Sequence, residues 1–160
     1  MYKVIVSALA IVALAGCADT RKLMGEDVKA TNLIPCPATG AAIGDVPSCG
    51  KVWKLTSGTA GLTPSGDLTA EVKGLVLNDA STGTANGTPD GVDGVAAAVV
   101  CGGVTGRKVG AQTDVVELSK EGNALVKANV SVPADCMKPV IVLRERYQGK
   151  IGGWLAATGM

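Results

Sequence analysis

The chain is divided into short apolar or alternating runs that are separated by glycine- and proline-rich stretches. In 67–77, Leu68, Ala70 and Val72 alternate with polar residues, and the same period of two recurs in 124–132. Such alternation is typical of a strand with one buried face and one wet face. Seven runs are expected to be strands, at intervals of about 10–15 residues: 51–56, 67–77, 95–102, 113–119, 124–132, 140–147 and 151–158.

This pattern predicts an all-β fold. The expected architecture is an antiparallel β-sandwich of immunoglobulin-like type with about seven strands. A small β-barrel is the alternative, because it uses the same short strands and turns. The stretches 57–66, 78–94 and 102–110 are expected to be loops or turns, since they are rich in Gly, Thr, Asn, Asp and Pro. Gly74, inside one predicted strand, indicates a bulge.

The N-terminus has the features of an export signal. Lys3 is the only charged residue before Asp19, and 4–14 is almost wholly apolar. This run is shorter than the about 20 apolar residues that a membrane-spanning helix needs, and it fits the apolar core of a secretory signal. The residues that follow resemble the lipobox of bacterial lipoproteins, and they are Leu14, Ala15, Gly16 and Cys17.

The lipobox resemblance implies that diacylglyceryl is transferred to the sulfur of Cys17 and that the chain is cleaved before it. A single acyl chain binds a membrane only marginally, whereas two or more hold a protein there. The expected organisation is a signal peptide at 1–16, a tether with a disulfide-tied segment at 17–50, and a β-sandwich domain at 51–160. The expected location is extracytoplasmic, with the lipid in the cell membrane or the outer membrane.

Four cysteines remain after Cys17, namely Cys36, Cys49, Cys101 and Cys136. An even number in an exported chain predicts two disulfides, and three pairings are possible. Cys36–Cys49 and Cys101–Cys136 are favoured. The first two lie in a segment rich in Pro and Gly, and the second two lie at the margins of predicted strands. In the chain-entropy model each such bridge stabilises the fold by about 3–4 kcal/mol.

A second resemblance covers about residues 67–159. It is carried by "GLVLNDASTGTANGTPDGVDGVAAAVVCGG", by "LSKEGNALVKANVSVPADC" and by the closing "GGWLAATG". These stretches resemble a type of uncharacterised exported bacterial domain, which implies a common fold and no particular activity. The resemblance also favours the 101–136 bridge, because both cysteines fall inside the shared stretch.

The chain contains no histidine. This removes Ser-His-Asp and Cys-His catalysis and most zinc sites. One of the 15 basic residues, Lys3, precedes Cys17, so 14 basic residues face 14 acidic ones in the expected mature chain. Balanced charge gives no electrostatic case for nucleic-acid binding. The expected function is therefore a non-enzymatic structural or binding module of the cell envelope, with an envelope protein or a glycan as partner.

The polar loop at 78–94 is the best candidate for a binding segment. Asp79, Asp90 and Asp93 offer carboxylate oxygens there, and calcium takes about six to eight oxygen ligands. Calcium-dependent binding of a glycan or protein is thus the alternative function. The competing interpretation is that Asn, Asp, Gly and Thr are ordinary hairpin-loop residues.

Two further groups have a simpler structural interpretation. Trp53 and Trp154 could stack on a sugar, but a chain without Phe is expected to need them as core residues. Asp67, Glu71 and Glu117 could supply a carboxylate pair for glycoside hydrolysis. Nothing in their spacing brings two of them into one cleft.

The charged run around 144–150 is a candidate for binding an anionic glycan or a phosphate headgroup. It contains Arg144, Glu145, Arg146 and Lys150. The alternative is that it is the solvated, charged face of an edge strand, where charge prevents aggregation.

Overall fold

The computed structural model describes residues 28–102 and 107–159, and this part of the chain is all-β with antiparallel pairing throughout. The predicted lipidation site Cys17 and the signal peptide at 1–16 lie outside the described residues. The strands are β1 Val28–Pro35, β2 Trp53–Lys54, β3 Ser57–Leu62, β4 Asp67–Lys73, β5 Val76–Leu77, β6 Val92–Cys101, β7 Lys108–Gln112, β8 Val116–Glu117, β9 Ala124–Asn129, β10 Val140–Tyr147 and β11 Lys150–Thr158.

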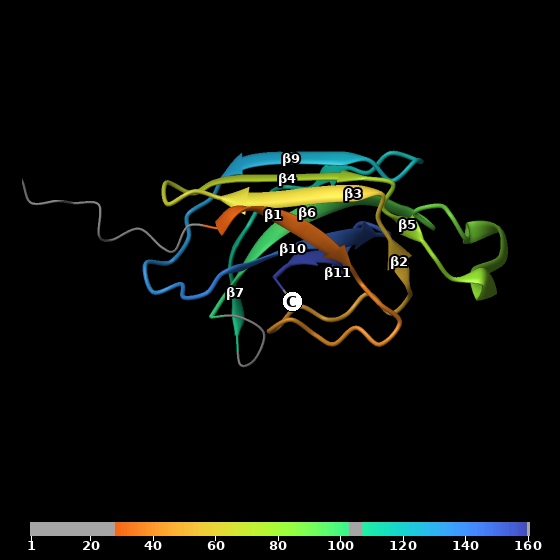
Figure 1. The fold of residues 1–160 in the computed structure, drawn as a ribbon, viewed down its shortest axis with the longest axis horizontal. Coiled ribbons are helices and arrows are strands. Elements are labelled where there is room, and N and C mark those ends of the chain that lie inside the picture. The colour runs from red at the N-terminus through yellow and green to blue at the C-terminus, as the bar shows by residue number, and fades with distance from the viewer. Residues whose placement is uncertain (1–27, 103–106, 160) are drawn as a thin grey trace, which may run out of the picture.

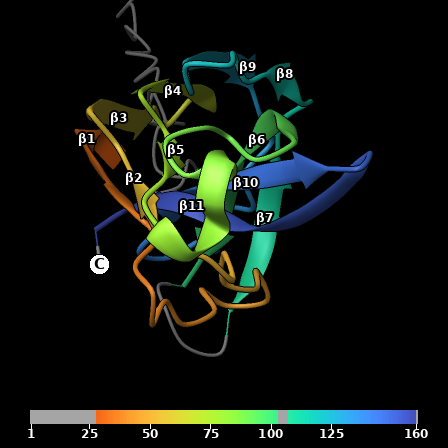
Figure 2. The same ribbon diagram turned by 90° about the vertical axis from the view of Figure 1, so that its right-hand side faces the viewer.

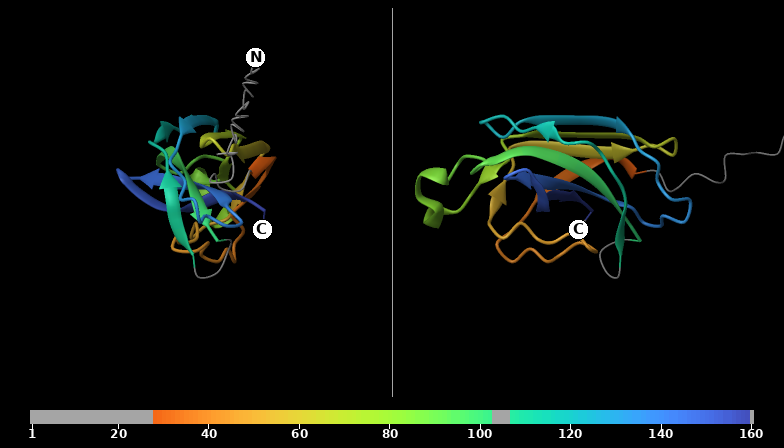
Figure 3. Two further views of the ribbon diagram at one scale, coloured as in Figure 1. Left: turned by 90° about the vertical axis from the view of Figure 1, so that its left-hand side faces the viewer. Right: turned by 180° about the vertical axis from the view of Figure 1, so that it is seen from behind.

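Nine of these strands form a single sheet in the order β7-β6-β10-β11-β1-β3-β4-β9, with β8 also paired to β6. The sheet curls strongly into a half-barrel (Figures 1 and 3). One arm consists of β3, β4 and β9, and it faces the other arm, β6, β10 and β11, across the core. Strand β1 joins the two arms, because its residues up to Asn32 pair with β3 and those from Leu33 pair with β11.

The core follows from the alternation seen in the sequence. In β4, Leu68, Ala70 and Val72 are each 1 % exposed while their neighbours face solvent. Strand β6 is buried on both faces, as its apolar run predicts. Trp53 and Trp154 are 4 % and 1 % exposed, so the prediction that they are core residues is confirmed.

Both predicted disulfides are present. Cys36 and Cys49 are bonded with 6.2 Å between their Cα atoms, and Cys101 and Cys136 with 4.7 Å. The first closes a loop that lies against β11, where Trp154 donates its backbone N–H to Pro47 O at 3.0 Å and its indole N–H to Ala41 O at 2.9 Å. The second ties the end of β6 to the segment that leads into β10.

Three segments that were expected to be irregular contain strands, and one of them is β7, Lys108–Gln112, which begins inside the turn predicted at 102–110. Ser57–Leu62, predicted as part of a loop, is β3, and Val28–Pro35, predicted as part of the tether, is β1. Only Ala60 and Leu62 are buried in β3 and only Leu33 in β1, so neither segment shows a clear apolar stripe. Pairing on both sides makes them strands, which illustrates how sheet context overrides local propensity.

Predicted strands were also displaced or divided. The strand expected at 67–77 is interrupted at Gly74, which has a φ of 65° and approaches Thr56 so closely that a Cβ would lie 2.3 Å from its Oγ1. The strand expected at 51–56 contains only β2, and the one at 113–119 only β8. In the part of the chain that the structure describes, no helix is long and apolar enough to cross a membrane.

Candidate functional site

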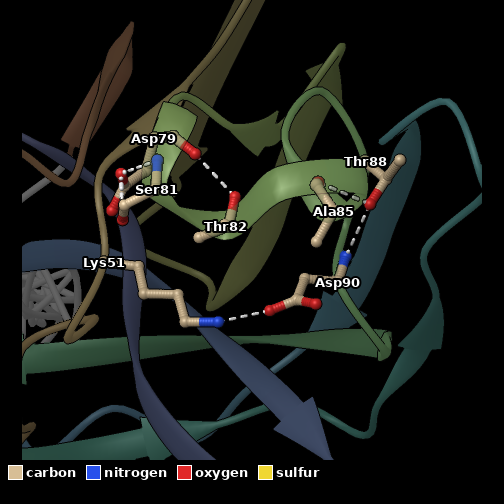
Figure 4. A network of polar contacts seen from close by, with 7 residues as sticks. All are labelled: Lys51, Asp79, Ser81, Thr82, Ala85, Thr88 and Asp90. Carbon is tan, nitrogen blue, oxygen red and sulfur yellow. Dashed lines mark hydrogen bonds and ion pairs between the residues drawn. The ribbon is translucent and has the colours of Figure 1, made fainter.

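The loop between β5 and β6 is held in place by its own polar side chains (Figure 4). It contains the 3-10 helix η2, Ala80–Ala85, which projects from one end of the half-barrel (Figure 1) and lies in front of the strands when that end faces the viewer (Figure 2). Asp79 caps η2 and accepts hydrogen bonds from the backbone N–H of Ser81 at 2.9 Å and from its hydroxyl at 2.6 Å. These bonds lower the pKa of the Asp79 carboxyl. Thr88 ties the end of the loop to η2, because its hydroxyl donates to Ala85 O at 2.8 Å.

The structure does not bring the three predicted calcium ligands together. Asp79 is engaged with Ser81, Asp90 forms an ion pair with Lys51, and Asp93 accepts from Arg146 Nε at 2.7 Å. Over residues 28–102 and 107–159, no three side chains of His, Cys, Asp or Glu are grouped so that they could hold a metal ion.

A cleft of about 300 Å³ lies beside the Lys51–Asp90 ion pair. The segment around Cys49, the end of the η2 loop and strand β10 enclose it. Its lining residues are Cys49, Gly50, Lys51, Trp53, Asp90, Val92, Glu145 and Tyr147. Lys51 extends toward Asp90 beneath η2 (Figure 4), so this ion pair closes one side of the cleft. We refer to this feature as the Glu145 cleft.

Glu145 is half-buried in this cleft. It lies in β10 where the pairing with β11 shifts register on either side of Arg144. Its Oε1 accepts a hydrogen bond from Gly153 N at 3.3 Å, and a Cβ on Gly152 would lie only 2.6 Å from the same oxygen. Gly152 therefore provides the space that this carboxyl occupies, and Gly153 provides the N–H that it accepts from.

The environment of Glu145 disfavours its charged form. Burial raises the pKa of its carboxyl, and the Gly153 N–H and the positive charge of Lys51 oppose that effect only in part. No ion pair of the described residues includes Glu145, because Lys51 pairs with Asp90 and Arg146 with Asp93. The carboxyl is thus partly desolvated without a cation of its own.

Aromatic side chains form the apolar part of the cleft lining. The Tyr147 ring lies against Gly91, where a Cβ would be 3.2 Å from ring atom Cε2, and this side chain is 44 % exposed. Trp53 is buried beside the cleft, and its indole N–H has no hydrogen-bond partner among the described residues. An apolar group in the cleft would therefore contact Tyr147 and Val92 near the Glu145 carboxyl.

The charged run at 144–150 does not act as one surface. Arg144 donates from Nε to Gly152 O at 3.1 Å and from its guanidinium to Gln112 Oε1 at 2.8 Å, whereas Glu145 lines the cleft. Lys150 is exposed at the β10–β11 turn. The edge-strand interpretation is wrong, because β10 is paired on both sides, with β6 and β11.

The proposed carboxylate pair for hydrolysis is not found in the cleft. Asp67 accepts from Asn129 Nδ2 at 2.9 Å and from Ser65 Oγ at 2.8 Å, and these bonds lower its pKa. Glu71 pairs with Lys73 at 3.1 Å, and Glu117 lies in β8. None of the three acids lines the Glu145 cleft.

Sequence reasoning missed Lys51 and Tyr147 as site residues and placed Glu145 on a solvated surface. Lys51 and Asp90 are 39 positions apart, so no local pattern links them. The available signal was the pair Gly152–Gly153, which lies across a tight turn from a charged strand. Consecutive glycines inside a strand often mark a place where another group approaches the backbone closely.

The pH dependence of stability should identify Glu145. Because its pKa is raised in the folded state, the folded chain binds more protons between the unfolded and folded pKa values, and stability falls as pH rises through that window. Glu145→Gln carries no charge at any pH. The melting temperature of the variant, relative to wild type, is therefore expected to increase between about pH 4 and about pH 8.

Glu121→Gln is the matched control, with the opposite expected sign. Hydrogen bonding by Ser119 lowers the pKa of the exposed Glu121 carboxyl, so its charged form favours the folded state. The melting temperature of this variant, relative to wild type, should fall as pH rises toward the ordinary pKa of Glu, about 4.3, and should then stay level up to about pH 8. Equal slopes for the two variants would contradict the assigned environment of Glu145.

No protein-family model, curated protein or solved structure matches this chain. What the protein binds must therefore be inferred from its own residues.

Proposed function

We propose that the protein is a membrane-anchored extracytoplasmic lipoprotein that acts as a non-enzymatic structural or binding module of the cell envelope. The observation that carries this proposal is the pair of disulfides in one small fold, Cys36–Cys49 and Cys101–Cys136. Structural disulfides persist mainly in oxidising compartments outside the cytoplasm. The lipobox resemblance at Cys17 adds the means of attachment.

The Glu145 cleft favours binding over a purely structural role. Its volume of about 300 Å³ is at the lower end of the range of small-ligand sites, roughly 300–1,000 Å³. The Cys36–Cys49 bridge and the Lys51–Asp90 pair fix one wall, and the central strand β10 provides another. A partner protein or a glycan could place a small group in such a preformed site.

We infer further that the two arms correspond to the two layers of an immunoglobulin-like sandwich. The crossing of β1 from one arm to the other supports this assignment. Folds of that type carry their binding loops at the ends of the layers. The η2 loop occupies such an end (Figure 1).

Anchoring is tested with Cys17→Ser. In cells that are fed a clickable palmitate analogue, the wild-type product is expected to carry the label, to begin at Cys17 and to fractionate with membranes. The variant should lose the label and the attachment. A wild-type product that keeps residues 1–16, or that takes up no label, would contradict the proposal.

Partner binding is tested with a photo-crosslinking amino acid at the rim of the cleft, in place of Tyr147. Leu125 in β9 is the control position, because it is 50 % exposed, against 44 % for Tyr147, and does not line the cleft. We expect a discrete product from position 147 in intact envelopes and none from position 125. Absence of any product at 147 would contradict a macromolecular partner at this cleft.

Calcium-dependent binding through the 78–94 loop is the alternative. For Asp90 and Asp93 to share an ion, both would have to give up their present partners, Lys51 and Arg146. A calcium ion at about 100 times its Kd would stabilise the fold by about 2.7 kcal/mol. Chelator would then lower the melting temperature and calcium would restore it, whereas we expect an unchanged melting curve.

A further inference from the structure

The Glu145 cleft combines a negative charge with an apolar wall. Glu145 contributes a half-buried carboxyl, and the charge of Asp90 is compensated by Lys51. The cleft therefore carries one uncompensated negative charge when Glu145 is ionised. Burying a charge is unfavourable unless it is paired, so a ligand that brings a positive charge would recover much of the desolvation free energy.

The residues of the cleft disfavour other classes of ligand. An anion would meet Glu145, while the one ammonium group among the lining residues, on Lys51, is already engaged with Asp90. A hard metal ion needs about six or more oxygen ligands. Where the structure describes the chain, no suitable group of carboxylates exists.

We propose that this cleft binds an organic ammonium group, with the Glu145 carboxylate as its charge partner and the Tyr147 ring beside its apolar chain. This inference rests on the proposed binding function and specifies its chemistry. An ammonium group offers three hydrogen-bond donors. Glu145 Oε1 has one donor, Gly153 N at 3.3 Å, so the carboxylate retains capacity to accept from the ligand. Aromatic faces also attract cations.

The site is shaped for a side-chain-sized group. Gly152 leaves room for Glu145, and Gly91 allows the Tyr147 ring to lie against the backbone at the rim. Val92 and the Cys49 end of the disulfide complete the apolar lining. The ammonium group could come from a free amine or from a lysine side chain of a partner, and both present the same chemistry to Glu145.

The test is a titration of the ¹⁵N-labelled full chain, followed by NMR. Pentylamine represents a free amine, and a lysine tripeptide with blocked ends represents a partner side chain. We expect a Kd of roughly 1 mM for at least one of them, with shifts concentrated at the Gly153 amide and the Trp53 indole. Pentanol, which has the same chain without the charge, should cause no comparable shifts.

Glu145→Gln is expected to raise the Kd for the amine tenfold or more, while Glu71→Gln, on the distant strand β4, leaves it unchanged. Binding should weaken at low pH, since protons compete for Glu145, which faces Lys51, Asp90 and Tyr147 in the cleft. Preference for the tripeptide or for pentylamine identifies the source.

Equal shifts with pentanol, an unchanged Kd in Glu145→Gln, or no shifts with either amine at about 20 mM, well above the expected Kd, would overturn the inference. The photo-crosslink at position 147 has a separate outcome. Its success without amine binding would leave the binding module intact and remove only the ammonium chemistry.

Discussion

Gly122→Ala is expected to destabilise the fold by about 3–5 kcal/mol, one of the largest effects of any single methyl group in this chain. Gly122 is buried in the β8–β9 turn and has a φ of 78°. A Cβ there would lie 2.3 Å from the carbonyl oxygen of Leu75 and 2.6 Å from its nitrogen. Leu75 is fully buried, and its N–H donates to Gly122 O at 2.9 Å. The methyl group can fit only if the turn moves away and this bond is broken.

The loss in Gly122→Ala has two contributions, the strain of a left-handed backbone and the clash with Leu75. Gly87→Ala separates them. Gly87 has a φ of 82°, close to that of Gly122, but nothing lies within 4 Å of the position of its Cβ. It should therefore show only the backbone strain of a left-handed conformation, about 1–2 kcal/mol. Urea unfolding, followed by the fluorescence of the two buried tryptophans, measures both variants. Equal losses would mean that the contact with Leu75 is unimportant.

Some strands could be predicted from the sequence because their own residues show a clear pattern of apolar and polar side chains. Leu68, Ala70 and Val72 of β4 alternate with polar residues because one face of that strand packs on the core. Strand β6 was also predictable, because its continuous apolar run matches a strand that is buried on both faces. The disulfides were also predictable, since the spacing and context of the four cysteines favour one of only three pairings.

The strands that escaped prediction depend on distant partners. Strand β1 has a single well-buried apolar side chain, Leu33, yet it joins β3 to β11 at the centre of the sheet. Its conformation is set by hydrogen bonds to two other strands, which a local pattern cannot reveal. This is also why the sequence predicted about seven strands and began the folded domain at residue 51.

The candidate site was not predicted from the sequence for the same reason, since its residues come from distant parts of the chain. Glu145 reads as part of a charged run, and only its pairing with β11 places its carboxyl beside Gly152 and Gly153. The Lys51–Asp90 pair that closes the cleft joins segments 39 residues apart. The predicted calcium ligands were assigned from the oxygen-bearing residues along the 78–94 loop, whereas the structure gives each aspartate its own donor or cation.

Removal of both disulfides should have the largest effect of all. In the chain-entropy model, replacing Cys101 and Cys136 by alanine, which opens a loop of 35 residues, costs about 4 kcal/mol. Replacing Cys36 and Cys49, which are 13 residues apart, costs about 3 kcal/mol. Together these losses approach the whole stability of a typical domain, about 5–15 kcal/mol.

The two double-alanine variants are also expected to differ in their effect on ligand binding. The 36–49 loop lies against β11 through Trp154, and Cys49 lines the cleft, so its bridge is expected to support ligand binding as well as stability. Neither Cys101 nor Cys136 lines the cleft, so their bridge should affect stability alone. Urea unfolding with and without dithiothreitol measures the losses, and the two alanine pairs combined should match the reduced wild type. A chain that stays fully folded when both bridges are reduced would not need an oxidising compartment, and the main support for an extracytoplasmic location would be lost.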